Sequence, residues 1–314
     1  MRKGHLILGL VLLIMMAILP ATAITGGSAV PLPTPYRPPE TVRVKVLHAD
    51  TGTVSEYDMQ EYLFGVVAAE MSLSYPKAAV QAQTIAAYTL TLHRMETRAK
   101  NPPEWLKGAH VTDDSGTDQA FITRDLAMAK WGENAKTNAA NLDAWIKEVL
   151  GKKVTYNGQT ALTVYHSISG GRTEAAQIMW GGTYPYLVPV ESVGDLMSEG
   201  YISEKTFSFE EVAKKILATF TADSTLAVAQ RSDSGTVLAA TFGEKTLTGK
   251  EVRELFTLRS ANFDVELTDK GVTFTVRGYG HGMGMSQYGA KVMAEQGSTY
   301  EEILKWYYTG CRLE

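Results

Sequence analysis

The sequence predicts an α+β fold in which helices and antiparallel hairpins are arranged around a groove. Helical and strand patterns follow one another without the regular alternation of a doubly wound sheet. Between the strand patterns VTY and QTALTV, Asn157-Gly158 supplies the positive φ angles of a tight type I′ hairpin turn. Two capping boxes, Ser208 with Glu211 and Thr248 with Glu251, each open a helical pattern.

The elements are expected in a definite order along the chain. Alternating residues 42–47 predict a first strand, and residues 58–71 a first helix. Pro76 is expected to begin a second helix, which ends before Asn101-Pro102-Pro103. Residues 104–148 mix helical stretches with a polar loop. Further expected elements are a hairpin over 154–164, strands near 237–242, 263–267 and 272–276, and a last helix from Ser298 or Thr299.

The N-terminal residues predict export. Arg2 and Lys3 precede an apolar run, so residues 1–24 are interpreted as a membrane anchor or a cleaved signal peptide, of which we favour the anchor. Residues 25–41, rich in Pro, Gly and Thr, are expected to form a stalk. The folded catalytic domain then covers residues 42–314 on the extracytoplasmic side of the cell membrane, and it would be secreted if the N-terminus is cleaved.

Composition excludes several classes of function. The chain has 314 residues and a formal net charge of −4, and no Lys/Arg-rich run follows the first few residues, so nucleic acid is not expected as a partner. With one cysteine, Cys311, no intrachain disulfide or thiolate cluster forms, and we expect a packed thiol. The six histidines are scattered and never reach zinc spacing, so we expect no metal and no cofactor.

Glu70 is an unusual acidic residue. It lies in the apolar stretch VVAAEMS, and no other acidic residue occurs between Tyr62 and Met95. It follows Leu63, Val66 and Val67 at helical spacings, which predicts that it shares their buried face. Burial disfavours the ionised carboxylate, so a raised pKa and a role as general acid are expected. The alternative is a structural glutamate paired with an arginine or with backbone amides.

Two glycine-rich stretches are candidate ligand sites. The first, YHSISGGRTE, places hydroxyls and an imidazole beside two glycines, which would let a ligand approach the backbone. The second, GYGHGMGMSQYGA, has neutral donors and acceptors with an aromatic ring but lacks the basic residue of a phosphate loop, so a sugar fits it better. The alternative for both is a tight polar turn. The candidate binding residues are His166, Ser167, Ser169, Gly170, Gly171, Thr173, His281, Ser286, Gln287 and Tyr288.

Together these stretches resemble the stage II sporulation protein D family of bacterial lytic transglycosylases. The resemblance rests on three blocks in order and covers most of the chain after the stalk: MQEYLFGVVAAEMSLSYPKAAVQAQTIAA, YHSISGGRTE and GYGHGMGMSQYGA. It implies cleavage of peptidoglycan glycan strands during engulfment of the forespore, with Glu70 as the essential acid. It also implies two partners, an amidase that first strips the stem peptides and a membrane scaffold protein.

A transglycosylase can act with a single acid. Its nucleophile is the C6 hydroxyl of the muramic acid being cleaved, so the attack is intramolecular. A hydrolase usually needs two carboxylates, and Glu174 is the candidate for the second. A non-catalytic glycan-binding or scaffolding module is the remaining alternative.

Two departures from the family pattern bear on these alternatives. Tyr88 occupies a position where relatives commonly carry an arginine of the active groove, so either another basic residue such as Lys77 replaces it or activity is weaker. Some relatives hold zinc through Cys and His after the second helix, whereas this chain has His110 there and no cysteine.

Overall fold

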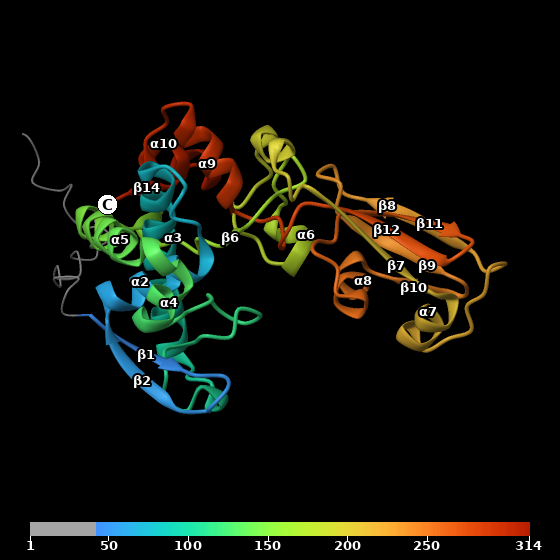
Figure 1. Cartoon of the computed structure of the whole chain (residues 1–314), viewed down its shortest axis with the longest axis horizontal. Helices are drawn as coiled ribbons and strands as arrows, with labels where there is room; N and C mark the ends of the chain where they lie inside the picture. The colour runs from blue at the N-terminus through green and yellow to red at the C-terminus, as the bar shows by residue number, and fades with distance from the viewer. Residues whose placement is uncertain (1–41) are drawn as a thin grey trace, which may run out of the picture. The chain divides into compact units, whose positions relative to one another are not determined.

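The computed structural model describes residues 42–314, and it confirms the predicted α+β fold (Figure 1). The predicted anchor and stalk, residues 1–24 and 25–41, lie outside the described residues. Within the described part of the chain, no helix is both long enough and apolar enough to cross a membrane. The domain boundaries and the location therefore stay predictions.

The larger hydrophobic core is mainly helical and contains α2 and α3. Eight of the twelve residues of α2 are buried, and α3 buries an alanine-rich face against it. The last two helices, α9 and α10, pack against α3, so the C-terminal part of the chain completes this core (Figure 1). The helices of this part are α2 (Met59–Glu70), α3 (Lys77–Lys100), α4 (Arg124–Trp131), α5 (Ala135–Val149), α6 (Ala176–Trp180), α9 (Gln287–Glu295) and α10 (Tyr300–Tyr307).

Short strands and 3₁₀ helices complete this region. β1 pairs antiparallel with β2 and parallel with β3, and β4 pairs antiparallel with β5 and β14. The strands are β1 (Arg43–Leu47), β2 (Val54–Asp58), β3 (Val111–Thr112), β4 (Val154–Tyr156), β5 (Gln159–Thr160), β6 (Tyr165–His166), β13 (Met285–Ser286) and β14 (Arg312–Leu313). The 3₁₀ helices are η2 (Glu104–Leu106), η3 (Gly132–Asn134) and η4 (Val193–Met197).

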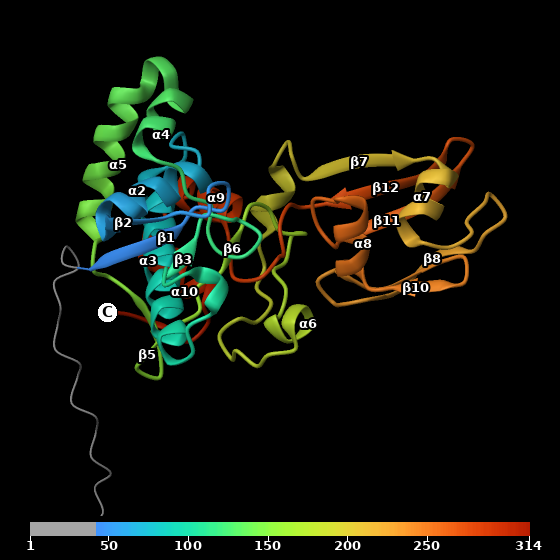
Figure 2. The same cartoon turned by 90° about the horizontal axis from the view of Figure 1, so that it is seen from below.

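A second hydrophobic core forms between residues 207 and 276 from two antiparallel sheets and two helices (Figure 2). It is aromatic: Phe242, Phe256 and Phe274 are buried, with ring centroids 4.8–6.2 Å apart. Its elements are β7 (Ile202–Phe207), α7 (Phe209–Ile216), β8 (Leu226–Arg231), β9 (Val237–Phe242), β10 (Lys245–Leu247), α8 (Gly249–Phe256), β11 (Phe263–Thr268) and β12 (Gly271–Arg277).

Local sequence signals located several of the helices and strands. Both predicted capping boxes are present, and Asn157 and Gly158 have the positive φ angles expected for the hairpin turn. The predicted hairpin is shorter than expected, because β5 ends at Thr160. Pro76 is the N-cap of α3 and not its first residue.

Candidate active site

Glu70 is the last residue of α2. Asp58 caps the start of the helix by accepting a hydrogen bond from the backbone N–H of Glu61, and Met71 ends it in an extended conformation. The prediction that one apolar face of this helix is buried is wrong in detail, because residues 62–68 are buried on every side of the helix. The helix is therefore embedded in the core, and its end carries the partly exposed Glu70 to the surface of a cleft.

The surroundings of Glu70 favour its protonated form. Burial raises the pKa of this carboxyl above its ordinary value, and this effect outweighs the opposing hydrogen bonds from Ala120 and Gln287 and the positive charge of Lys130. Its position at the negative end of a helix dipole acts in the same direction as burial. Glu70 can therefore hold a proton at a higher pH than an exposed glutamate.

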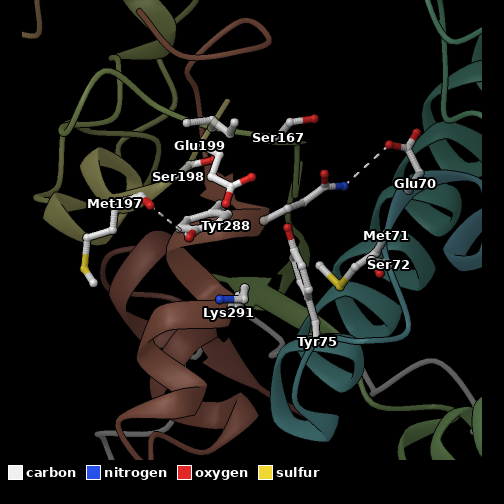
Figure 3. Close-up of a pocket in the computed structure, with 12 residues that line it drawn as sticks. Glu70, Met71, Ser72, Tyr75, Ser167, Met197, Ser198, Glu199, Tyr288 and Lys291 are labelled. Atoms are coloured by element: carbon white, nitrogen blue, oxygen red, sulfur yellow. Dashed lines mark hydrogen bonds between the residues drawn. The ribbon is translucent and has the colours of Figure 1, made fainter. Parts of the chain in front are cut away.

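Two donors orient the carboxyl group of Glu70. The backbone N–H of Ala120 donates to Oε1 at 2.9 Å, and the side-chain amide of Gln287 lies 3.5 Å from Oε2 (Figure 3). The alternative of a structural glutamate, paired with an arginine or with backbone amides, is supported in part, since one backbone amide contacts this carboxyl group. No arginine pairs with Glu70 among the contacts of residues 42–314.

Glu70 opens onto a cleft of about 470 Å³. Four segments that are distant in sequence form its walls: the end of α2 with the following turn, the first glycine-rich stretch, the end of η4 with the loop after it, and the start of α9. The lining residues are Glu70, Met71, Ser72, Tyr75, Ser167, Ile168, Met197, Ser198, Glu199, Gln287, Tyr288 and Lys291 (Figure 3). Hydroxyls, an amide and two tyrosine rings thus face the same space as the acid.

The two glycine-rich stretches lie side by side. β6 pairs in parallel with β13, with His166 opposite Ser286, and the backbone N–H of Tyr288 donates to the carbonyl of Ser167 at 3.0 Å. Gly278 has a φ of +76°, and a Cβ there would lie 2.6 Å from the carbonyl oxygen of Ile168. The glycine therefore lets the two stretches approach each other, which differs from the expected approach of a ligand.

Asp195 of η4 joins the two stretches. The hydroxyl of Ser169 donates to Oδ2 of Asp195 at 2.5 Å, and the hydroxyl of Ser286 donates to Oδ1 at 2.7 Å. The backbone N–H of Ser169 adds a third hydrogen bond, and Asp195 is fully buried. Because η4 ends at the lining residue Met197 and leads directly into Ser198 and Glu199, this buried carboxylate also positions one wall of the cleft.

The predicted binding residues fall into two groups. Ser167, Gln287 and Tyr288 line the cleft with Glu70. The others are not among the residues that line it. Ser169 and Ser286 bond Asp195, and Thr173 bonds the backbone of Val190. The N–H of Gly171 donates to the Ser169 hydroxyl, the carbonyl of Gly170 accepts from the Tyr201 hydroxyl, and His166 packs against His281. Contact of this second group with a sugar stays a prediction.

His166 and His281 form a pair of neutral imidazoles. Their ring centroids are 5.7 Å apart, and His166 Nδ1 lies 2.9 Å from the carbonyl of Met283. Burial lowers the pKa of both rings, to about 3 for His281, where the neighbouring His166 and Arg253 also contribute. Neither ring is a cation at neutral pH, so neither supplies the proton that Glu70 can supply.

A buried polar network supports the loop that donates to Glu70. The side chain of Gln119 accepts from the hydroxyl of Tyr165 at 2.8 Å and donates to that of Thr91 at 3.0 Å. Ala120, the next residue, is thereby held where its N–H reaches Glu70. The sequence hypothesis missed Gln119 and Ala120, because they belong to a loop whose partners are distant in sequence.

Other missed residues had a readable signal. Tyr75 lies in the short turn that follows Glu70. Lys291 lies four residues after Gln287, so an N-cap at Ser286 would have predicted α9 and placed both side chains on one helical face. Glu199 and Asp195 had no local signal, because their roles depend on tertiary contacts.

The structure also locates the residues of the alternative hypotheses. Glu174 is buried, accepts hydrogen bonds from Ala175 and Ser232, and is not among the lining residues of the cleft. Tyr88 is buried in the larger core, and Lys77 pairs with Glu148 away from the cleft lining. In residues 42–314, no group of three or more His, Cys, Asp or Glu side chains is arranged to hold a metal ion.

Comparison with known proteins identifies the family of this chain. The family model described as stage II sporulation protein matches residues 48–156, which include Glu70 and Ala120. Stage II sporulation protein D of Bacillus amyloliquefaciens is 33% identical over 270 residues, covering 86% of this chain and 78% of the relative. The chain belongs to the stage II sporulation protein D family.

Other relatives extend the comparison. Stage II sporulation protein D of Bacillus subtilis is 33% identical over 87% of this chain and 79% of the relative. A B. subtilis protein named amidase enhancer is 26% identical over 80% of this chain but only 40% of its own length. The family is thus one of sporulation proteins.

Proposed function

We propose that this chain is a peptidoglycan lytic transglycosylase, which cleaves peptide-stripped glycan strands during endospore engulfment and leaves 1,6-anhydro-muramic acid ends. The supporting observation is Glu70, a carboxyl group with a raised pKa that faces a cleft lined by hydroxyls, an amide and tyrosine rings.

In the first step Glu70 is the general acid. It gives its proton to the glycosidic oxygen, the bond from that oxygen to C1 of the muramic acid breaks, and positive charge develops at C1. The carboxylate left behind keeps the Ala120 N–H at Oε1 and the Gln287 amide near Oε2. Both donors stabilise the ionised form that this step creates.

In the second step Glu70 is the base. It takes the proton of the C6 hydroxyl of the same sugar while O6 bonds to C1 and closes the 1,6-anhydro ring. Glu70 is then protonated again, so the cycle needs no further acid. The attack is intramolecular, which replaces a second activating carboxylate by proximity.

Hydrolysis is a second candidate because Glu199 lines the same cleft as Glu70. If Glu199 activated a water molecule, the cleft would hold the two carboxylates that a glycosidase uses. The buried Glu174, considered earlier for that role, already accepts two hydrogen bonds and is absent from the lining. A glycan-binding module without activity is the third candidate.

The proposal extends to location and partners. The chain would act on the outer side of the mother-cell membrane, where the apolar N-terminal residues 1–24 would anchor it. It would work beside a sporulation amidase and a membrane scaffold protein. The relative named amidase enhancer supports a link with an amidase.

Analysis of product ends tests the proposal. The purified full-length chain is incubated with peptide-free glycan strands, and the chain ends are identified by mass spectrometry. We expect anhydro ends from the wild type and from Glu199→Gln, and no cleavage by Glu70→Gln. Reducing ends that disappear in Glu199→Gln would indicate hydrolysis, and intact strands with measurable binding would indicate a binding module.

A further inference from the structure

Lys291 is the only basic side chain among the residues that line the cleft in the described part of the chain. It lies on α9, one turn after Gln287, whose amide contacts Glu70. Its ammonium nitrogen is 4.8 Å from the ring centroid of Tyr288 and 5.9 Å from that of Tyr75. The two rings pack edge to face, 6.4 Å apart, so a cation and two aromatic rings form one cluster (Figure 3).

The existing partner of Lys291 leaves it able to bind a ligand. Nζ lies 2.9 Å from Glu295, an i,i+4 neighbour that is not among the lining residues of the cleft. The side chain of Lys291 is 22% exposed and that of Glu295 is 47% exposed, and a solvated pair of this kind contributes little. An ammonium group has three donors, so a contact with Glu295 leaves others for the cleft.

The chemistry of the cluster suits a sugar that carries an acid. Tyrosine rings pack against the apolar face of a sugar ring, and an ammonium group pairs with a carboxylate. Each muramic acid bears a lactyl ether, whose carboxylate is free only where no stem peptide is attached. Glu199 lines the same cleft, and its negative charge would repel such a group, so an acidic sugar needs a cation nearby.

We propose that Lys291, Tyr75 and Tyr288 form a subsite for the free lactyl carboxylate of a muramic acid residue, which makes Lys291 a determinant of specificity for peptide-free glycan. This inference rests on the proposed function, since it names the substrate group that the same cleft recognises. A stem peptide joined to the lactyl group would remove the charge that Lys291 pairs with.

Binding measurements on an inactive background test the subsite. The full-length Glu70→Gln chain is titrated with peptide-free muramyl oligosaccharides and with the same oligosaccharides converted to lactyl methylamides. Adding Lys291→Met should weaken binding of the acid form about tenfold, which is the order of one charged hydrogen bond. It should change binding of the methylamide less than about twofold, within the scatter of surface substitutions.

Two further variants serve as controls. Lys291→Arg keeps the charge and should keep the preference for the acid form. Glu295→Gln removes the neighbouring carboxylate outside the cleft and should leave binding equal or tighter. The proposal is overturned if Lys291→Met weakens both oligosaccharides equally, or neither, in a protein whose melting temperature is unchanged.

The outcomes separate this inference from the proposed function. A wild type that cleaves glycan while Lys291→Met binds both forms as well as its parent rejects the subsite alone. A wild type that cleaves nothing, but prefers the acid form through Lys291, rejects the transglycosylase and keeps the subsite.

Discussion

The regions around Glu70 and Asp195 use the same chemical group in opposite ways. Glu70 faces a cleft, with one good hydrogen bond from Ala120 and a long contact to Gln287. Asp195 is fully buried and accepts three hydrogen bonds, including one serine hydroxyl from each glycine-rich stretch. One carboxyl group has few donors and a raised pKa, whereas the other joins three segments of the chain.

This comparison shows that the number of donors decides the role. A carboxyl group that accepts several hydrogen bonds from separate segments holds the structure together, whereas one that is buried with few donors has a raised pKa. The cleft that Glu70 faces therefore depends on Asp195. Asp195 fixes the two stretches whose residues Ser167, Gln287 and Tyr288 line the cleft.

The largest expected effect is the loss of activity in Glu70→Gln. The amide has nearly the same shape and can still accept from the Ala120 N–H, but it cannot give up a proton. Turnover of peptide-free glycan should fall about 10²–10⁴-fold, the usual contribution of a general acid. The melting temperature at neutral pH should not decrease, because an ionised Glu70 with a raised pKa costs stability. A variant that unfolds would instead make Glu70 structural.

Asp195→Asn should instead reduce the stability of the protein. An amide nitrogen would face a serine hydroxyl or a backbone N–H that now donates, which leaves a buried donor unpaired. The free energy of unfolding should fall by about 1–3 kcal/mol, and the melting temperature by about 2–4 °C for each kcal/mol. Thermal unfolding of both variants measures the contrast. An unchanged melting temperature for Asp195→Asn would contradict the role of Asp195.

Two serines sharpen the comparison at smaller scale. Ser286 bonds Asp195 and also caps α9 by accepting from the backbone N–H of Gly289, so Ser286→Ala should cost about 1–2 kcal/mol. The hydroxyl of Ser167 lines the cleft, so Ser167→Ala should change stability by less than about 0.5 kcal/mol and instead raise KM for glycan. Equal effects on stability would remove the distinction between the two regions.

The histidine pair predicts a pH dependence of stability. The pKa of His281 is lowered in the folded state. Its contribution to the free energy of unfolding is therefore complete above the unfolded pKa of about 6.5, and it is lost as pH falls toward about 3. One such group changes the free energy of unfolding by at most about 1.4 kcal/mol per pH unit. The free energy of unfolding, measured with denaturant at pH values between 4 and 7, should rise with pH with a smaller slope in His281→Asn than in the wild type. Identical slopes would show that His281 is not desolvated.

The sequence predicts local features of this molecule well and distant contacts poorly. The N-cap of α2, the hairpin turn and the capping boxes depend on neighbouring residues, and the structure contains them. The sequence indicates Glu70 because an acidic residue within an apolar run is unusual in any fold. The helix around it is buried on all sides, which no stripe of three- and four-residue spacings could indicate.

The remaining features of the site depend on contacts across the chain. Ala120 reaches Glu70 from a loop 50 residues away, and Asp195 joins serines that are 26 and 91 residues from it. The sequence predicts that the glycines make room for a ligand, and it does not indicate that Gly278 also lets one stretch approach the other. A residue's neighbours in space determine such roles, and the local pattern does not contain them.

The most direct test of the central claim is a titration of the Glu70 carboxyl group by NMR. The protein is labelled with ¹³C at glutamate side chains, and Glu70→Gln identifies the resonance that belongs to Glu70. The account predicts a midpoint clearly above the ordinary glutamate value of 4.5, and a loss of glycan cleavage as pH rises through that midpoint. A midpoint at or below 4.5, with cleavage unaffected, would show that Glu70 is ionised when the enzyme works and does not donate the proton.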